Sequence, residues 1–239
     1  MFYLLAVLVV VLVILLVCYP SWFYNHFIYT VSRSQPFYTD DEKRTIFPQS
    51  TLLEDSWESI RDEYLQIKIN DHGNIGENIL DEFDPEFFKG WSMFPLRVFG
   101  YDVTENMKQI PALSSVLRSS PNIVSAYISV LEPGKKLRPH SGPFAGIIRY
   151  HLGLSIPYNN ETESCYIYVN KKKYLWKDGE GILFDEMYEH HAANLSDLHR
   201  VVLFLDIVKP LSYPFNKVNE SVIHHIGKTK KVQRAIHKR

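Results

Sequence analysis

Two histidines and two arginines in one window of the sequence could together perform redox chemistry. His140 lies in the segment RPHSGP and His190 ends the segment FDEMYEH, while Arg149 and Arg200 lie between and after them. Neutral imidazole is a good ligand for a divalent metal such as Fe(II), and it is used in this way by non-haem iron oxygenases. The guanidinium group of arginine presents a planar fork that matches a carboxylate. The combination indicates an oxygenase that binds a metal and a dicarboxylic co-substrate.

The composition indicates one domain of ordinary globular type. The chain has 239 residues, of which 46% are hydrophobic, and this is enough for one sizeable core. A net charge of -1 argues against a nucleic-acid-binding protein, although residues 228–239 hold six basic residues and no acidic one. The rest of the chain then has 20 basic and 27 acidic residues, a charge of -7. The only cysteines are Cys18 and Cys165, so no disulfide framework is indicated. Two cysteines do not distinguish an oxidising from a reducing compartment.

The N-terminus has the features of a membrane anchor. Residues 2–19 contain no charge, no amide side chain, no Gly and no Pro. As a helix they would be about 27 Å long, which is close to the apolar thickness of a bilayer. A cleaved signal peptide is the alternative, but no basic residue precedes the run and no small-residue cleavage site follows it. We therefore expect a single-pass membrane protein anchored by residues 1–20, with the downstream basic residues favouring a cytoplasmic catalytic domain.

Between the anchor and the core, residues 21–50 show no sustained periodicity, and we predict a membrane-proximal linker there. From Ser50 to Ile67, apolar residues recur at helical spacing, which predicts a helix. A second helix is predicted over residues 111–118. Residues 213–239 form a basic tail, either a solvated disordered end or a polybasic segment near anionic lipid.

The middle of the chain changes to a period of two. Short segments rich in Val, Ile, Tyr and Phe are separated by turn signals, and several strands at close spacing favour a sandwich or jelly roll over a parallel sheet. The expected strands are residues 123–131, 147–156, 165–169, 174–176, 181–184 and 201–208. We expect a mainly β dioxygenase domain over residues 51–212.

These segments, in this order, resemble the aspartyl/asparaginyl β-hydroxylase family. The resemblance runs roughly over residues 53–211 and includes WESIRDE, GWSMFPL, RPHSGP, RYHLGL, WKDG and FDE. It implies a double-stranded β-helix, a cupin-like jelly roll with N-terminal helices packed on it. It also implies an enzyme, a dioxygenase that uses Fe(II), 2-oxoglutarate and O2. Within the family, RYHLGL, DGE and FDE together with an N-terminal anchor also resemble the bacterial lipid A 2-hydroxylases.

The resemblance implies that His140 and His190 are the iron ligands. Many iron oxygenases take a third ligand from a carboxylate two residues after the first histidine, but this chain has Gly142 there. Family members with the same glycine use two protein ligands, with water in the remaining position. Asp185 or Glu186 could orient that water, or Glu186 could be surface charge only.

The same resemblance gives the co-substrate residues. Arg200 would hold the distal carboxylate of 2-oxoglutarate with help from Ser129, and Arg149 and His151 would face the end that chelates the metal. Strand alternation independently puts Arg149 and His151 on one face. Structural ion pairs are the alternative for both arginines.

The sequence is compatible with two classes of function, an active hydroxylase and a non-catalytic scaffold. The complete set of iron and co-substrate residues favours a hydroxylase over a non-catalytic membrane scaffold on the same fold. The substrate at the membrane face is either the β-carbon of Asp or Asn in a protein or the acyl chain of a membrane lipid, and the sequence slightly favours the protein. His191, His224 and His225 are assigned no role in the site.

Overall fold

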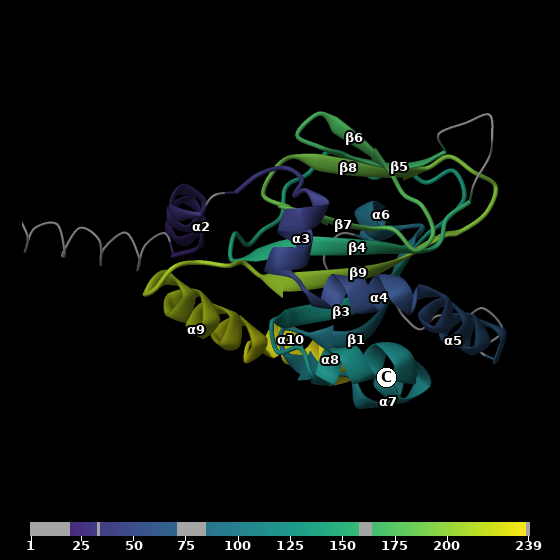
Figure 1. The fold of residues 1–239 in the computed structure, drawn as a ribbon, viewed down its shortest axis with the longest axis horizontal. Helices are drawn as coiled ribbons and strands as arrows, with labels where there is room; N and C mark the ends of the chain where they lie inside the picture. The colour runs from purple at the N-terminus through teal and green to yellow at the C-terminus, as the bar shows by residue number, and fades with distance from the viewer. Residues whose placement is uncertain (1–19, 33, 71–84, 158–163, 238–239) are drawn as a thin grey trace, which may run out of the picture.

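The core of the protein is a pair of antiparallel β-sheets packed face to face (Figure 1). A computed structural model describes residues 20–32, 34–70, 85–157 and 164–237. The strands are β1 (Trp91–Val98), β2 (Tyr101–Asp102), β3 (Ile123–Leu131), β4 (Ile147–Ser155), β5 (Cys165–Val169), β6 (Lys172–Leu175), β7 (Gly181–Phe184), β8 (His190–Asn194) and β9 (Arg200–Val208). The larger sheet has the order β2-β1-β3-β9-β4-β7 and the smaller one has β6-β5-β8. The predicted β-sandwich with helices is thus confirmed.

Both faces of the larger sheet are buried, and alternation along β9 shows why. Leu203 and Leu205 face the helices and belong to the larger hydrophobic core. Val202 and Phe204 face the smaller sheet and belong to a second core between the sheets. Because successive side chains point to opposite faces, one apolar strand serves both cores.

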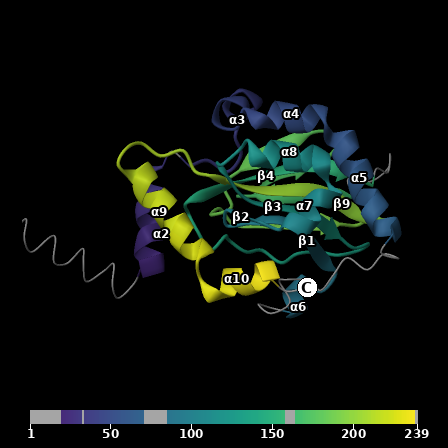
Figure 2. The ribbon, with the colours of Figure 1, turned by 90° about the horizontal axis from the view of Figure 1, so that it is seen from below.

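Several helices cover the outer face of the larger sheet (Figure 2). They are α3 (Asp40–Ile46), α4 (Gln49–Asp55), α5 (Trp57–Asn70), α7 (Thr104–Gln109) and α8 (Pro111–Arg118), and the short α6 (Pro85–Phe88) precedes β1. The helix predicted over residues 111–118 has the bounds of α8. The single helix predicted from Ser50 to Ile67 is two helices, with Ser56 at the break between them.

Our description of residues 21–50 and 213–239 as linker and tail was wrong in its local structure. Helices α2 (Pro20–Val31) and α3 occupy the first segment, and α9 (Phe215–Gly227) and α10 (Lys230–His237) occupy the second. Tyr24 and Ile28 of α2 and Ile223 of α9 form a third core with Phe144 and Ile147. The amphipathic pattern is weak in α2 but clear in α9 and α10, so the two C-terminal helices could have been predicted from the sequence. Contacts with the sandwich help to stabilise α2 and α9.

The remaining differences concern short segments. Strands β1, β2 and β8 were not among those predicted, and β6 begins two residues before the predicted segment. The predicted anchor falls on residues 1–19, which lie outside the described residues. No helix within the described ranges is both long and apolar enough to cross a bilayer.

A buried lysine fastens the helical layer to the sheet. The Nζ atom of Lys43 in α3 lies 2.7 Å from Oε1 of Glu54 in α4 and donates to the carbonyl oxygen of Gly181 in β7 at 2.7 Å. The hydroxyl of Tyr150 in β4 donates to the same Glu54 oxygen at 3.1 Å. The side chain of Lys43 is only 4% exposed, so its charge depends on these partners.

We expect Lys43→Met to lower the free energy of unfolding by about 3 kcal/mol, because it leaves the largely buried Glu54 without its cation. Denaturant unfolding followed by circular dichroism would measure the change. The control is Lys108→Met, since Lys108 forms an exposed pair with Glu105 and its loss should cost less than about 0.5 kcal/mol. An equal loss in both variants would show that the buried pair has no special weight.

Candidate functional site

The two predicted metal ligands lie side by side at one end of the sandwich. The backbone N–H of His140 donates to the carbonyl oxygen of His190 at 3.0 Å, and the N–H of His190 donates back at 2.8 Å. Residues before His140 thereby run along β8, and the two imidazole centroids are 4.2 Å apart. This pairing brings together two residues that are fifty positions apart in the sequence.

Both imidazoles are prepared to bind a metal through the same nitrogen. Nδ1 of His140 lies 2.9 Å from the carbonyl oxygen of Arg138, and Nδ1 of His190 lies 2.9 Å from that of Tyr188. A carbonyl oxygen only accepts, so each Nδ1 carries the hydrogen and each Nε2 has its lone pair available. Burial lowers the pKa of His140, and burial together with His140 lowers the pKa of His190 to about 3. Neutral imidazoles are the form that a divalent metal requires.

Among the described residues, the two histidines are not joined by a third side chain that could complete a metal site. In the part of the chain that the structure describes, no group of three or more His, Cys, Asp or Glu side chains is arranged to hold a metal ion. The N–H of Gly142 donates to the carbonyl oxygen of Glu186 at 2.7 Å, and a β-carbon placed on Gly142 would overlap the Glu186 carboxyl group. The carboxylate of Glu186 therefore occupies the space that a side chain at position 142 would fill.

Of the two acidic residues considered for orienting a water, only Glu186 faces this space. Asp185 is buried and accepts from Nζ of Lys209 at 2.6 Å and from the N–H of Met187 at 3.0 Å, so its carboxylate is already used. Glu186 is also buried, and it forms a close ion pair with Arg149. Burial raises the pKa of Glu186 to about 7 against the opposing effect of Arg149.

Arg149 has carboxylate partners on two sides. Its Nη2 lies 2.9 Å from Oδ1 of Asp206 on the neighbouring strand, its Nη1 contacts Glu186, and its guanidinium lies 4.1 Å from the ring centre of Phe204. These contacts give Arg149 the ion pairs of a structural residue at the edge of the pocket. Its expected contact with the co-substrate remains a prediction.

Arg200 is in the opposite situation. It is 2% exposed, and its Nε and Nη1 atoms have no hydrogen-bond partner among the described residues. The guanidinium lies 4.7 Å from the ring centre of Trp176, and burial lowers its pKa to about 10. A buried cation without a counter-ion is unfavourable by several kcal/mol. The arrangement therefore fits an anionic ligand.

Neutral donors surround the same pocket. The Ser129 hydroxyl accepts from Nε1 of Trp91 at 2.9 Å, which leaves its own hydrogen free to donate. Neither ring nitrogen of His151 has a partner in the described structure, nor does Nε1 of Trp176. Burial lowers the pKa of His151 well below its usual value, and Arg149 and Arg200 lower it further.

All six residues predicted for the site line one small cavity between the sheets. They are His140, His190, Arg149, His151, Arg200 and Ser129. The cavity has a volume of about 30 Å³, room for roughly one water molecule. Binding of a larger molecule therefore requires its lining side chains to move apart.

Two further residues contribute to the site and were assigned no role from the sequence: Trp176 lines the pocket, and Asp206 lies behind Arg149. Trp176 covers Arg200, and Asp206 holds Arg149. Asp206 lies at a position of the same parity as Arg200 and Phe204 in its strand, so alternation could have indicated it. Trp176 was the last residue of the strand predicted over residues 174–176, but it follows β6 outside regular structure, so alternation did not indicate its role.

Comparison with known proteins identifies the family of this chain. The family model described as "Aspartyl/Asparaginyl beta-hydroxylase" matches residues 54–210. An ornithine lipid ester-linked acyl 2-hydroxylase from Rhizobium tropici is 39% identical over 134 residues, which are 56% of this chain and 47% of that protein. The human aspartyl/asparaginyl β-hydroxylase is 28% identical over 187 residues, 74% of this chain and 23% of that protein. This chain thus spans about half or less of the length of these relatives.

Among solved structures, a cupin domain of a transcriptional regulator from Enterobacter cloacae aligns with 51% of this chain and 99% of its own length, at 15% identity and a TM-score of 0.35. The residues matched by the family model include both histidines, both arginines and the strands that carry them. This chain belongs to the aspartyl/asparaginyl β-hydroxylase family.

Proposed function

We propose that this protein is an Fe(II)- and 2-oxoglutarate-dependent dioxygenase that hydroxylates the acyl chain of a membrane lipid. The observation that carries the catalytic part is the unpaired, buried guanidinium of Arg200 in the same pocket as two neutral histidines. A structural arginine would have a carboxylate partner, as Arg149 has. The pocket contains a cation and two neutral histidines that could bind a metal, and a dicarboxylic co-substrate would need both.

His140 and His190 would hold the iron through their Nε2 atoms. The backbone carbonyl groups that accept from Nδ1 fix both ring orientations, as outer-shell partners commonly do. The carboxylate of Glu186, which occupies the space beside Gly142, could accept a hydrogen bond from a water molecule on the metal. Arg149 would keep that carboxylate in place.

Arg200 would bind the distal carboxylate of 2-oxoglutarate, with Ser129 and Trp176 as neutral donors. His151, held neutral by its surroundings, would donate to the carboxylate nearer the metal. When bound, iron and 2-oxoglutarate use O2 to convert an aliphatic C–H bond into C–OH, and 2-oxoglutarate leaves as succinate and CO2. The apolar walls formed by Phe184 and Phe204 would keep bulk water from this chemistry.

The comparisons favour a lipid acyl chain as the substrate. The sequence slightly favoured the β-carbon of Asp or Asn in a protein. The 39% identity to a lipid acyl 2-hydroxylase exceeds the 28% identity to the human protein-modifying relative, although over fewer residues. The apolar segment of residues 2–19 would also bring the enzyme to lipid. Both features support hydroxylation at the carbon next to an acyl carbonyl.

We expect His140→Ala and His190→Ala each to weaken binding of Mn(II), a redox-stable substitute for iron, by about a hundredfold or more, since even outer-shell changes cost about 10- to 100-fold. Calorimetric titration would measure this, and iron-dependent succinate production should disappear. His191→Ala is the matched control, because the His191 ring stacks on Tyr168 and does not line the pocket. Normal metal affinity in the first two variants would contradict the proposed ligands and favour a non-catalytic scaffold.

For the co-substrate, Arg200→Ala should weaken 2-oxoglutarate binding by about 2 kcal/mol or more, the usual value of a charge-assisted hydrogen bond. Arg200→Lys should recover only part of this, because an ammonium group lacks the planar fork. Arg97→Ala serves as control, since Arg97 is also buried but is paired with Asp102 away from the pocket. An unchanged dissociation constant in Arg200→Ala would assign the carboxylate to another residue.

Direct assay of products would separate the two substrate classes. We expect the full-length protein in detergent, supplied with iron and 2-oxoglutarate, to add one oxygen to carbon 2 of a lipid acyl chain. Peptides containing Asp or Asn should stay unmodified. Mass spectrometry of both substrates after reaction would measure this, with His140→Ala as the inactive control. Hydroxylated peptide with unmodified lipid would reverse the proposal.

A further inference from the structure

Exposed apolar side chains collect at one end of the molecule. The described residues include seven large hydrophobic side chains that are exposed, and four of them lie on α2 or at the beginning of α9. These four are Tyr29, Val31, Tyr213 and Val218. Helices α2 and α9 lie side by side at this end in both ribbon views (Figures 1 and 2). Such a cluster marks an interaction surface more strongly than scattered residues do.

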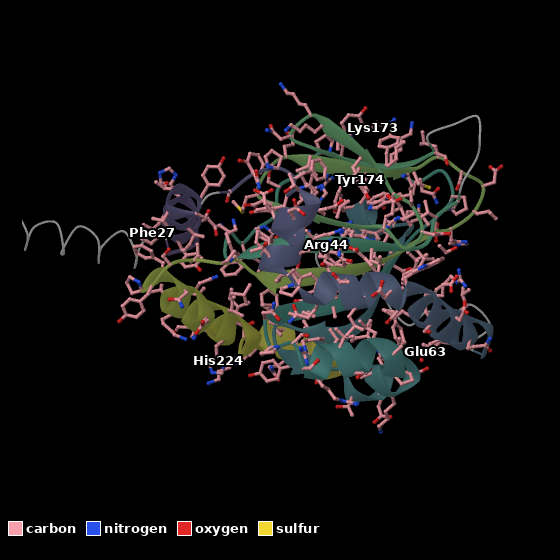
Figure 3. The ribbon with its side chains drawn as sticks, viewed as in Figure 1. Phe27, Arg44, Glu63, Lys173, Tyr174 and His224 are labelled. Carbon is pink, nitrogen blue, oxygen red and sulfur yellow. The ribbon has the colours of Figure 1, made fainter. Side chains whose placement is uncertain are left out.

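Basic residues continue this surface along α9 and α10. From residue 209 to the C-terminus the sequence has one acidic residue, Glu220. Among the side chains of this stretch that the structure describes, the exposed Lys, Arg and His residues are Lys217, His224, His225, Lys228, Lys230 and Arg234. His224 points outward from α9, on the side away from the sheets (Figure 3). We name the exposed side chains of α2, of residues 212–214 and of α9 and α10 the α2–α9 surface.

Helix α2 is fixed rigidly to the catalytic body. The Tyr24 hydroxyl donates to Oδ1 of Asn219 in α9 at 2.6 Å, and the Tyr24 ring stacks on Phe144. The Asn25 side chain donates to the carbonyl oxygen of Pro143 at 2.8 Å and accepts from the N–H of Ala145 at 2.9 Å. These hydrogen bonds attach α2 directly to the loop that follows His140.

The position of α2 along the chain indicates what the surface meets. The uncharged segment of residues 2–19 ends directly before α2 begins at Pro20. A segment of that composition partitions into lipid, so a bilayer would lie within the length of α2, about 18 Å, of the catalytic body. Anionic lipid attracts Lys and Arg, while apolar and aromatic side chains enter the interfacial region.

We propose that the α2–α9 surface rests on an anionic phospholipid bilayer and so sets the orientation of the catalytic domain. The same end of the sandwich holds the histidine pair, because α2 is bonded to Pro143 and contacts Tyr188 through Tyr29. The pocket is then held at the lipid interface without a flexible tether. This proposal goes beyond the proposed reaction, because membrane contact can be measured without turnover.

The experiment uses the full chain in vesicles of phosphatidylcholine with 30 mol% phosphatidylglycerol, a composition chosen for the assay. In a Cys18→Ala background, in which the remaining Cys165 is buried, an added cysteine replaces either Tyr213 or Leu198 and carries an environment-sensitive fluorophore. The two sites are matched, since both side chains are large, hydrophobic and exposed, at 81% and 67% respectively. Leu198 lies in the β8–β9 connection, outside the α2–α9 surface. Lipids with a nitroxide headgroup then quench any fluorophore at the interface.

We expect the label at position 213 to be quenched several times more strongly than the label at 198. Combined replacement of Lys217, Lys228 and Lys230 by Glu should reduce the quenching at 213 while lipid hydroxylation in detergent is retained. Equal quenching at both positions, or none at 213, would overturn the proposal and leave an acidic protein as the partner that this surface fits. Quenching unaffected by the charge reversal would overturn the role of the cations.

Discussion

The inner face of β4 and β9 must hold two sheets together and also carry the charges of a binding pocket. Val202 and Phe204 supply apolar contact to the smaller sheet, while Arg149, His151 and Arg200 project into the same interior. Charge inside such a layer is unfavourable unless it is paired or neutralised. Except for Arg200, the groups of the site each either pair or neutralise the charge that they bring into this interior.

The charged and titratable groups differ in how the unfavourable burial of charge is avoided. Arg149 is paired with Asp206 and Glu186, so its charge is compensated within the protein. The three histidines lose their charge, because burial lowers the pKa of each. Arg200 alone among these groups keeps an uncompensated charge, in contact with the ring of Trp176. This difference distinguishes an arginine that maintains structure from one that is available for a ligand.

The frame around the site is secured by buried lysines at its periphery. Lys43 joins α3 and α4 to β7, and Lys209 at the end of β9 holds Asp185 beside Glu186. Helix α2 adds a third connection, through Asn25, to the loop after His140. Helix α2, which precedes the sandwich in the sequence, therefore helps to position the loop that follows His140.

The sequence by itself determined most of the core strands, helix α8, the resemblance to the family and six of the residues that line the cavity. These features depend on local periodicity and on short segments whose order along the chain is visible. The tertiary structure alone decided the docking of α2 on Asn219, 195 residues away, and the pairing of Arg149 with Asp206, 57 residues away. It also decided that Asp185 is committed to Lys209 while Glu186 fills the space beside Gly142. Such partners are selected by distance and burial after folding, and neither quantity is encoded in the spacing of residues along a strand.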